Sequence, residues 1–328
     1  MLYIHGTGHF HPENILDNAF FENLEIETNE QWIVERVGIH RRRTVMDLEY
    51  IKQTKNEDIQ QASNNAKYTL AETAVPAVDM ALERAGLTRD DIGMVLANTC
   101  SSDYIVPSTA CLIAAELGIT NIPCVDLNSA CSSFATQIHF VDSMAAEGSP
   151  DYILLVQAEN WTKTVDYSDR KTSVLVGDAT AATIVSKKHV AAMRVNQTYL
   201  ESDPLNWKKV TVPNLTHFNQ EGPAVQKFAI KKTIATFKKL QETTEHVMAD
   251  NYFISHQANL TMLQSVCSKL NIPKEKHLYN VDEFGNCASA GAPSVLSQNW
   301  QKFKSGDHIS LIVVGAGLTW GGMTISID

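Results

Sequence analysis

Short apolar stretches alternate along this chain with longer segments in which apolar residues recur at helical spacing. The short stretches predict buried strands, and the longer segments predict amphipathic helices. The predicted helices cover residues 68–87, 107–117 (with Pro107 in its first turn), 131–146, 224–247, 258–269 and 291–304. The predicted strands cover residues 92–97, 122–127, 152–156, 179–186, 252–255, 277–282, 308–314 and 323–327. Strands and helices that alternate in this way are typical of an α/β fold.

The second half of the chain repeats features of the first. Val125 and Cys131 have counterparts in Val281 and Cys287, and each counterpart follows 156 residues later. A duplicated α/β unit explains this constant offset, and chance similarity of short apolar motifs is the alternative. The predicted halves are residues 1–186 and 187–328.

Composition limits the classes of protein to which this chain can belong. Of its 328 residues, 44% are apolar and 20% are charged, as in ordinary globular proteins. The formal net charge of −10 argues against a nucleic-acid-binding protein, which needs a broad basic face. The first residues lack a signal-peptide pattern, and no apolar run is long enough to span a bilayer. We therefore predict a cytoplasmic protein with no nucleic-acid or membrane partner.

The cysteines and histidines do not suggest a metal site. The six cysteines and eleven histidines are scattered, without a CxxC pair, an HExxH motif or a cluster at zinc spacing. This pattern predicts free thiols in a reducing compartment and no structural metal.

Cys131 is the residue whose position most suggests chemistry. It follows an apolar strand and a few small polar residues, at the predicted start of a helix. The N–H groups and the positive dipole end of a helix favour thiolate over thiol. A thiolate at this place suits a nucleophile that accepts an acyl group and then releases it. The alternative is a small buried cysteine that fills space beneath the helix.

Two further polar residues stand at predicted strand-to-helix turns. His256 follows an apolar strand, at the sheet edge where ligands bind in α/β folds. Asn286 lies in a Gly-Asn turn before a helix rich in small residues. Taken singly, a histidine there can be a hydrogen-bonded structural residue, and a Gly-Asn pair can be only a turn.

Together these residues occupy equivalent turns of a duplicated fold, and here the sequence resembles the β-ketoacyl-acyl-carrier-protein synthase III family of the thiolase superfamily. The resemblance covers nearly the whole chain. Its motifs are GTG at residues 6–8, EQWIVERVGI at 30–39, SAC at 129–131, GD at 177–178, SHQAN at 255–259, GN at 285–286 and GAGLTWG at 315–321. The resemblance implies a thiolase-like fold in which two duplicated α/β halves form αβαβα layers.

The resemblance also implies a mechanism. Cys131 would take an acyl group from a thioester, and His256 and Asn286 would hydrogen-bond the thioester carbonyl of a malonyl donor. Loss of carbon dioxide would leave a carbanion that attacks the acyl-Cys131 carbonyl and releases a 3-oxoacyl thioester. The backbone N–H groups of Cys131 and Ala316 match the oxyanion-hole positions, where one donor is typically worth about 3 kcal/mol of barrier. The substrates would be coenzyme A or phosphopantetheine thioesters, with no resident cofactor.

Substrate entry has its own residues in the family. Trp32 and Arg170 match positions that sandwich the adenine of coenzyme A, since a flat ring and a guanidinium can hold a purine. Arg36 is placed to meet nucleotide phosphates, and Asn259 matches a position that contacts pantetheine. Without the resemblance, Trp32 is equally compatible with a helix anchor in the core.

A group of lysines in one predicted helix contrasts with the acidic chain. They are Lys227, Lys231, Lys232, Lys238 and Lys239. An acidic acyl carrier protein could dock there by charge complementarity, and a solvated helix face is the alternative.

Several positions depart from the usual family pattern. Thr261 replaces an arginine that helps recruit the carrier protein, Gln226 replaces an aromatic residue, and Ala316 replaces a glycine. Val106 stands where a phenylalanine often closes the acyl pocket of the neighbouring subunit, so we expect an acyl group longer or bulkier than acetyl. With Ser132-Ser133, these departures favour a specialised pathway over housekeeping fatty-acid initiation.

The prediction is a homodimeric condensing enzyme that acts on acyl thioesters. Alternatives are an O- or N-acyltransferase of the same fold without decarboxylation, and a non-catalytic subunit that supports an active paralogue. A degradative thiolase would carry a second cysteine in the final glycine turn, and residues 315–317 contain none. The GTG and GAG segments do not fit a dinucleotide site, because the first lacks a third glycine and the second opens a strand.

Overall fold

The computed structural model describes residues 1–214, 216–244 and 248–328. Within them, nine strands form one mixed sheet in the order β11-β12-β13-β8-β1-β7-β6-β4-β5. Two short ribbons lie outside this sheet: β2 (Asn14–Asp17) with β3 (Arg41–Thr44), and β9 (Val210–Thr211) with β10 (Asn219–Gln220).

The main elements follow one another in two similar series. The first is β1 (Leu2–Phe10), α5 (Leu70–Ala85), β4 (Ile92–Asn98), α6 (Thr109–Glu116), β5 (Cys124–Asp126), α7 (Ser133–Ser143), β6 (Tyr152–Glu159) and β7 (Ala179–Ser186). The second is β8 (Met193–Ser202), α8 (Gly222–Gln241), β11 (Tyr252–Ser255), α9 (Leu260–Leu270), α11 (Gly291–Gln298), β12 (His308–Gly315) and β13 (Thr319–Ile327). The remaining helices are α1 (Asn18–Asn23), α2 (Glu30–Val37), α3 (Leu48–Thr54), α4 (Ile59–Ala62) and α10 (Val281–Phe284).

The strands of the two series pair in the same sense. β6 runs parallel to β4 and antiparallel to β7, and β7 pairs with β1. Likewise β12 runs parallel to β11 and antiparallel to β13, and β13 pairs with β8. A short antiparallel pairing between β1 and β8 joins both series into one sheet. Because the sheet continues across it, a domain boundary after residue 186 stays a prediction.

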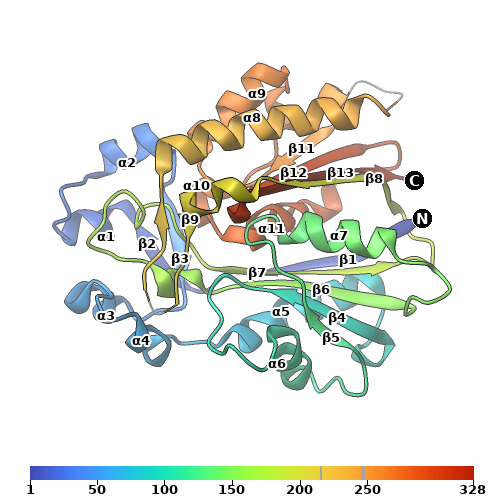
Figure 1. Ribbon diagram of the computed structural model, residues 1–328, viewed down its shortest axis with the longest axis horizontal. Coiled ribbons are helices and arrows are strands. Elements are labelled where there is room, and N and C mark those ends of the chain that lie inside the picture. Colours follow the sequence, from blue (N-terminus) through green and yellow to red (C-terminus); the bar gives the residue numbers. More distant parts are fainter. Residues whose placement is uncertain (215, 245–247) are drawn as a thin grey trace.

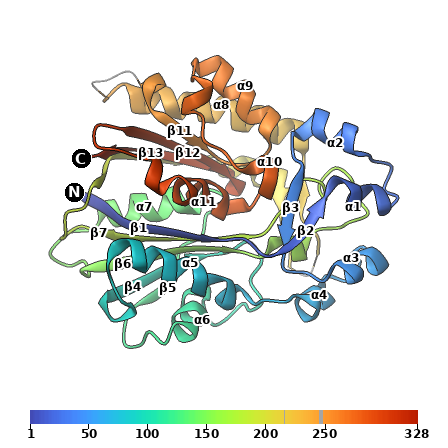
Figure 2. The ribbon, with the colours of Figure 1, turned by 180° about the vertical axis from the view of Figure 1, so that it is seen from behind.

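The helices form three layers around the strands (Figures 1 and 2). α5 and α6 pack on the strands of the first series, and α8 and α9 cover those of the second. α7 and α11 lie between, and each contacts strands of both series. One core cluster accordingly contains Ile138 of α7, Val295 of α11, Leu155 of β6 and Leu311 of β12. A middle layer buried on both sides needs apolar or small residues all round, and residues 291–297 are all buried.

One predicted strand is wrong. Residues 277–282 form no strand, and Val281 begins the short helix α10. His277 makes only an isolated bridge with Phe253, in which the Leu278 N–H donates to the Phe253 carbonyl. Pairing does not continue because the Asn280 N–H donates to Gln257 Oε1 and its carbonyl accepts from the first turn of α10. The apolar pattern of this segment arises from burial of Leu278 and Val281 rather than from strand pairing.

Other helices are present with different ends. α6 begins at Thr109 because Ser108 caps it, so Pro107 lies before the helix rather than in its first turn. α7 begins at Ser133, which leaves Cys131 just outside the helix. α8 ends at Gln241, and the predicted helical residues 245–247 lie outside the described part of the chain. α11 ends at Gln298 and a 3-10 turn follows it.

Candidate active site

A single cavity of about 1030 Å³ brings together residues that are far apart in the sequence. Its lining includes Cys131, His256, Asn286 and Ala316, which come from four separate turns. The turns follow β5, β11, α10 and β12, so the cavity lies where both series of strands end. Ligands commonly bind at such a place in α/β proteins.

A tight turn presents Cys131 to this cavity. Ala130 adopts a left-handed conformation with φ 52°, an uncommon conformation for a residue with a side chain. Asn128 holds the turn, because its Oδ1 accepts the Ala130 N–H at 2.7 Å and its Nδ2 donates to the Thr99 carbonyl at 2.9 Å. Cys131 itself is half-buried and lies two residues before the first residue of α7.

The two serines after Cys131 stabilise the same turn. Ser132 Oγ donates to the Ser129 carbonyl, and Ser133 Oγ donates to the Ala130 carbonyl, both at 2.7 Å. Both serines are fully buried. The hydroxyls that set this chain apart from the usual pattern therefore serve to hold the nucleophile turn.

The turn after β12 approaches Cys131 very closely. A Cβ placed on Gly315 would lie 3.0 Å from the backbone nitrogen of Cys131 and 2.7 Å from that of Ser132. Only glycine permits this approach. It puts the backbone of Ala316, the next residue, beside the Cys131 N–H group.

His256 continues the line of β11 and is buried against the cavity. Its backbone N–H donates to the Ile312 carbonyl at 2.9 Å, which fixes the residue beside β12. Burial lowers the pKa of His256 to about 4, so the imidazole is neutral at neutral pH. In the described part of the chain its buried Nδ1 has no hydrogen-bond partner.

Hydrogen bonds to both its N–H and its carbonyl fix the backbone of Asn286. Its N–H donates to the Leu175 carbonyl at 2.7 Å, and its carbonyl accepts from Trp161 Nε1 at 2.9 Å. Its side-chain Oδ1 accepts the Ala288 N–H at 3.0 Å. With the oxygen used in this way, the Nδ2 amide is the group that Asn286 can offer as a donor to a ligand.

The comparisons with known proteins agree with this arrangement. The chain matches the model of 3-oxoacyl-[acyl-carrier-protein (ACP)] synthase III over residues 125–204 and the model of its C terminal over residues 241–327. It is 32% identical to the β-ketoacyl-[acyl-carrier-protein] synthase III of Syntrophomonas wolfei, with 98% of this chain and 96% of the relative covered. The chain belongs to the synthase III family.

Other relatives and solved structures give the same result. The β-ketoacyl-[acyl-carrier-protein] synthase III of Clostridium novyi is 29% identical, with 97% of this chain and 96% of the relative covered. The crystal structure of the Aquifex aeolicus synthase III has a TM-score of 0.88 and 28% identity, with 99% of this chain and all of that one covered. The predicted family, thiolase-like α/β fold and condensing acyltransferase class are confirmed.

Sequence reasoning missed Cys100 and Glu159. Cys100 also lines the cavity, and it packs against the same apolar cluster as Cys131. The Cys131 side chain, burial and the nearby Glu159 raise the pKa of Cys100 well above its usual range. Glu159 accepts the Cys100 N–H at 2.8 Å and the Ser289 hydroxyl, and burial raises its pKa to about 7. Since Cys100 follows β4, the parallel neighbour of β5, strand order was the signal that could have found it.

Trp32, Arg36 and Asn259 line the cavity, whereas Arg170 does not. Arg170 instead lies over the indole of Trp32, with its guanidinium carbon 5.1 Å from the ring centre, and hydrogen-bonds the Glu27 carbonyl. A flat base between two such groups needs about 7 Å, twice an optimal carbon–carbon contact. Trp32 and Arg170 therefore have to separate before a purine can enter between them.

Asn259 and Thr261 are engaged at the start of α9. Asn259 Oδ1 caps the helix by accepting the Met262 N–H at 2.8 Å, which leaves its Nδ2 for a ligand. Thr261 Oγ1 donates to the Arg36 carbonyl at 2.9 Å. The residue that replaces the family's arginine thus joins α9 to α2 instead of presenting a charge.

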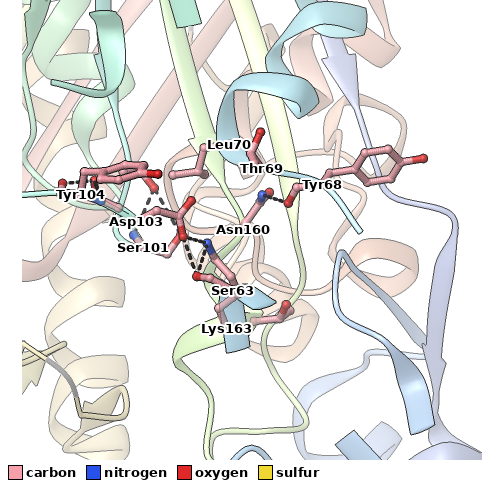
Figure 3. A network of polar contacts seen from close by, with 12 residues as sticks. Ser63, Tyr68, Thr69, Leu70, Ser101, Asp103, Tyr104, Asn160 and Lys163 are labelled. Atoms are coloured by element: carbon pink, nitrogen blue, oxygen red, sulfur yellow. Dashed lines mark hydrogen bonds and ion pairs between the residues drawn. The ribbon is translucent and has the colours of Figure 1, made fainter. Parts of the chain in front are cut away.

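Val106 lies outside the cavity of its own chain, on a projecting loop. Its side chain is 78% exposed, and that of Ile105 is 91% exposed. Figure 3 shows what anchors this loop: Asp103 accepts from Ser63 Oγ at 2.6 Å and pairs with the buried Lys163. A fixed base and an exposed apolar tip are what an interaction site needs.

The predicted lysine face is smaller than the sequence suggested. Lys232 lies 3.6 Å from the ring centre of Trp320, and Lys239 pairs with Glu242 at 2.9 Å. Lys227 and Lys231 instead border a shallow apolar groove together with Lys269, which sequence reasoning missed. Pro223 and Gln226 line both this groove and the cavity, so the two are adjacent.

The part of the chain that the structure describes contains neither a membrane-spanning helix nor a metal-binding cluster. Within residues 1–214, 216–244 and 248–328, no helix has the length and apolar character needed to cross a membrane. The same residues contain no group of three or more His, Cys, Asp and Glu side chains arranged to bind a metal.

Proposed function

We propose that this enzyme joins an acyl group carried on Cys131 to the carbanion of a second thioester. A malonyl thioester gives this carbanion by decarboxylation, and a 3-oxoacyl thioester would give it by loss of the acidic proton between its two carbonyls. The observation that carries the proposal is that Cys131, His256, Asn286 and the Ala316 turn line one cavity. A nucleophile, two neutral donors and a backbone oxyanion hole are the groups that such a condensation requires.

In the first half-reaction Cys131 attacks the carbonyl carbon of an acyl thioester. The oxygen of the tetrahedral intermediate accepts hydrogen bonds from the N–H groups of Cys131 and Ala316. The close approach of Gly315 to the Cys131 nitrogen supports this part of the proposal. When the intermediate collapses, the carbon–sulfur bond to the carrier breaks and the carrier leaves as a thiol. The acyl group then remains on Cys131.

In the second half-reaction His256 and Asn286 donate to the thioester carbonyl of the malonyl donor. These donors stabilise the enolate that forms when the bond to the departing carbon dioxide breaks. The carbanion attacks the acyl carbon, and the Cys131 thiolate leaves from the second tetrahedral intermediate. The product is a 3-oxoacyl thioester, and the cysteine is regenerated.

Trp32, Arg36, Arg170 and Asn259 are the residues proposed to guide coenzyme A or phosphopantetheine into the cavity. Asn259 offers Nδ2 to the pantetheine arm, while Arg36 is exposed and available to phosphates. Arg170 has to leave its contact with Trp32 if the pair is to hold adenine. An acyl carrier protein would use the groove beside the cavity, where Lys227, Lys231 and Lys269 provide positive charge.

We propose a homodimer in which the loop bearing Val106 reaches a second copy of the chain. Its apolar tip is exposed, and β5 ends the sheet with Val125 49% exposed. Exposed apolar residues and an open strand edge both favour association. With valine rather than phenylalanine at the tip, the acyl pocket of the second copy has room for a group larger than acetyl, as a specialised pathway would use.

The remaining expectations rest on the sequence alone. We propose that the enzyme works in the cytoplasm without a resident cofactor, and that residues 1–186 and 187–328 are its two duplicated units.

Intact-protein mass spectrometry with a panel of acyl thioesters tests the proposal. The wild type should gain the mass of one acyl group, and Cys131→Ala should gain none. Carbon dioxide release from malonyl thioester should follow, and His256→Ala should abolish it. Absence of any Cys131-dependent mass gain would refute the proposal, and acylation without carbon dioxide release would indicate simple acyl transfer.

A further inference from the structure

Two thiols lie side by side in the cavity, and acyl transfer through Cys131 uses only one of them. Cys100 and Cys131 are both half-buried in the wall of the cavity, and both pack against the same apolar cluster. The side chain of Asn128 joins their turns, because it donates to the Thr99 carbonyl and accepts the Ala130 N–H. The two turns that carry the thiols are therefore held beside each other.

The surroundings give the two thiols different chemistry. Cys131 precedes the N-terminus of α7 and is the nucleophile of the proposed acyl transfer. Cys100 takes no part in that transfer, and the Cys131 side chain, burial and the neighbouring Glu159 raise its pKa, so it stays a thiol. Redox-sensitive cysteines are commonly accessible thiolates with a second, resolving cysteine beside them.

We propose that Cys100 and Cys131 are a modification site, at which a hydroperoxide converts the two thiols into an intramolecular disulfide. A disulfide needs the sulfurs about 2 Å apart, closer than a hydrogen bond, so the two turns move slightly together. Both sulfurs lie on turns rather than within strands, which permits this movement.

The reaction has two balanced steps. The Cys131 thiolate attacks the peroxide, so that an S–O bond forms, the O–O bond breaks, and hydroxide leaves and takes up a proton. The Cys100 sulfur then attacks the sulfenic sulfur while Glu159, its hydrogen-bond neighbour, takes the thiol proton. The S–S bond forms, the S–O bond breaks, and water departs. In total, two electrons pass from the thiols to the peroxide.

The disulfide has a clear consequence for the cavity. A sulfur bound to Cys100 cannot accept an acyl group, and it is protected from irreversible oxidation to sulfinic acid. A dithiol reductant restores both thiols. The modification itself needs no acyl substrate, so it can be tested whether or not the proposed condensation is correct.

Peptide mapping after treatment of the whole protein with hydrogen peroxide tests the proposal. After the peroxide treatment, the remaining free thiols are blocked with an alkylating reagent. The protein is then cleaved on the N-terminal side of aspartates. Cys100 falls in residues 91–102 and Cys131 in residues 126–141, whereas Cys111 and Cys124 stay together in residues 103–125. A disulfide between the first two peptides, with the loss of two hydrogen masses and reversal by dithiothreitol, is the expected result.

Variants sharpen this experiment. Cys100→Ser should lose the cross-linked peptide and convert Cys131 to sulfinic acid that dithiothreitol does not reverse. Cys111→Ser is the matched control, because Cys111 is an exposed thiol in α6 that does not line the cavity, and it should keep the cross-link. Wild-type protein in which peroxide leaves Cys131 unmodified, or oxidises it without joining Cys100, would overturn the proposal.

Discussion

The N–H group of Ala316 can be removed with little change to the backbone, which makes the proposed oxyanion hole directly testable. Ala316 is the first residue of the 3-10 turn η9 (Ala316–Leu318), and Gly315 before it is extended, with φ −140° and ψ 177°. Proline is tolerated at the first position of a helical turn and favours an extended residue before it. Ala316→Pro therefore deletes the donor and keeps the local conformation.

The expected loss of Cys131 acylation depends on how closely the turns that carry Cys131 and Ala316 pack. A Cβ on Gly315 would lie 3.0 Å from the Cys131 nitrogen, so the turn that carries Ala316 packs directly against the Cys131 backbone. Loss of one oxyanion-hole donor typically slows catalysis by about 100- to 1,000-fold, or about 3 kcal/mol. We expect a fall of that size in acylation of Cys131. Alkylation of Cys131 by iodoacetamide forms no oxyanion and should stay near the wild-type rate.

Rapid-quench mass spectrometry measures the rate at which Cys131 is acylated, and circular dichroism confirms that each variant is folded. Ala316→Gly is the matched control, because it changes the side chain and keeps the N–H group. The reasoning is refuted if folded Ala316→Pro is acylated at the wild-type rate. It is also refuted if acylation of Ala316→Gly slows by the same factor, because the side chain at this position would then matter and the N–H donor would not.

Three further predictions concern burial and charge. Burial raises the pKa of Glu159 from 4.5 to about 7, so the folded protein binds more protons than the unfolded chain between those values and loses stability as the pH rises. Across this pH window the free energy of unfolding, measured by urea denaturation, should decline by about 3 kcal/mol less for Glu159→Gln than for the wild type. An equal decline in the two proteins would contradict the assignment. Because burial lowers the pKa of His256 to about 4, carbon dioxide release should show no histidine titration between pH 7 and 5; an inflection near 6.5 would oppose this. Val106→Phe should shift acylation of Cys131 toward shorter acyl thioesters, and an unchanged chain-length profile would argue against its place in an acyl pocket.

Much of the fold could be predicted from the sequence because its strands are short apolar runs with clear ends. The repeated order of elements was visible in the offset between Val125 and Val281. The places of Cys131, His256 and Asn286 followed from one rule, that turns at the carboxyl ends of strands meet at a common edge. These three residues line one cavity, although their roles stay predictions.

Other features depended on contacts that no local pattern records. Residues 277–282 have the apolar spacing of a strand, but the Asn280 N–H that would continue the pairing donates to the side chain of Gln257 instead. Arg170 was matched to a position that holds adenine, yet its guanidinium lies over the indole of Trp32. Cys100 was overlooked because a cysteine after a strand carries no signal until the neighbouring strand is known to lead to Cys131.

The neutral state of His256 bears on how a decarboxylating site can work. A protonated imidazole would attract the malonyl carboxylate and stabilise it, which would oppose the loss of carbon dioxide. Burial lowers the pKa of His256 to about 4, so its ring meets the substrate as an uncharged hydrogen-bond donor. Asn286 is a second uncharged donor, because its oxygen is already used by the Ala288 N–H. Such donors strengthen their bonds as negative charge moves from the carboxylate to the thioester oxygen, and they therefore favour the enolate over the bound malonyl group.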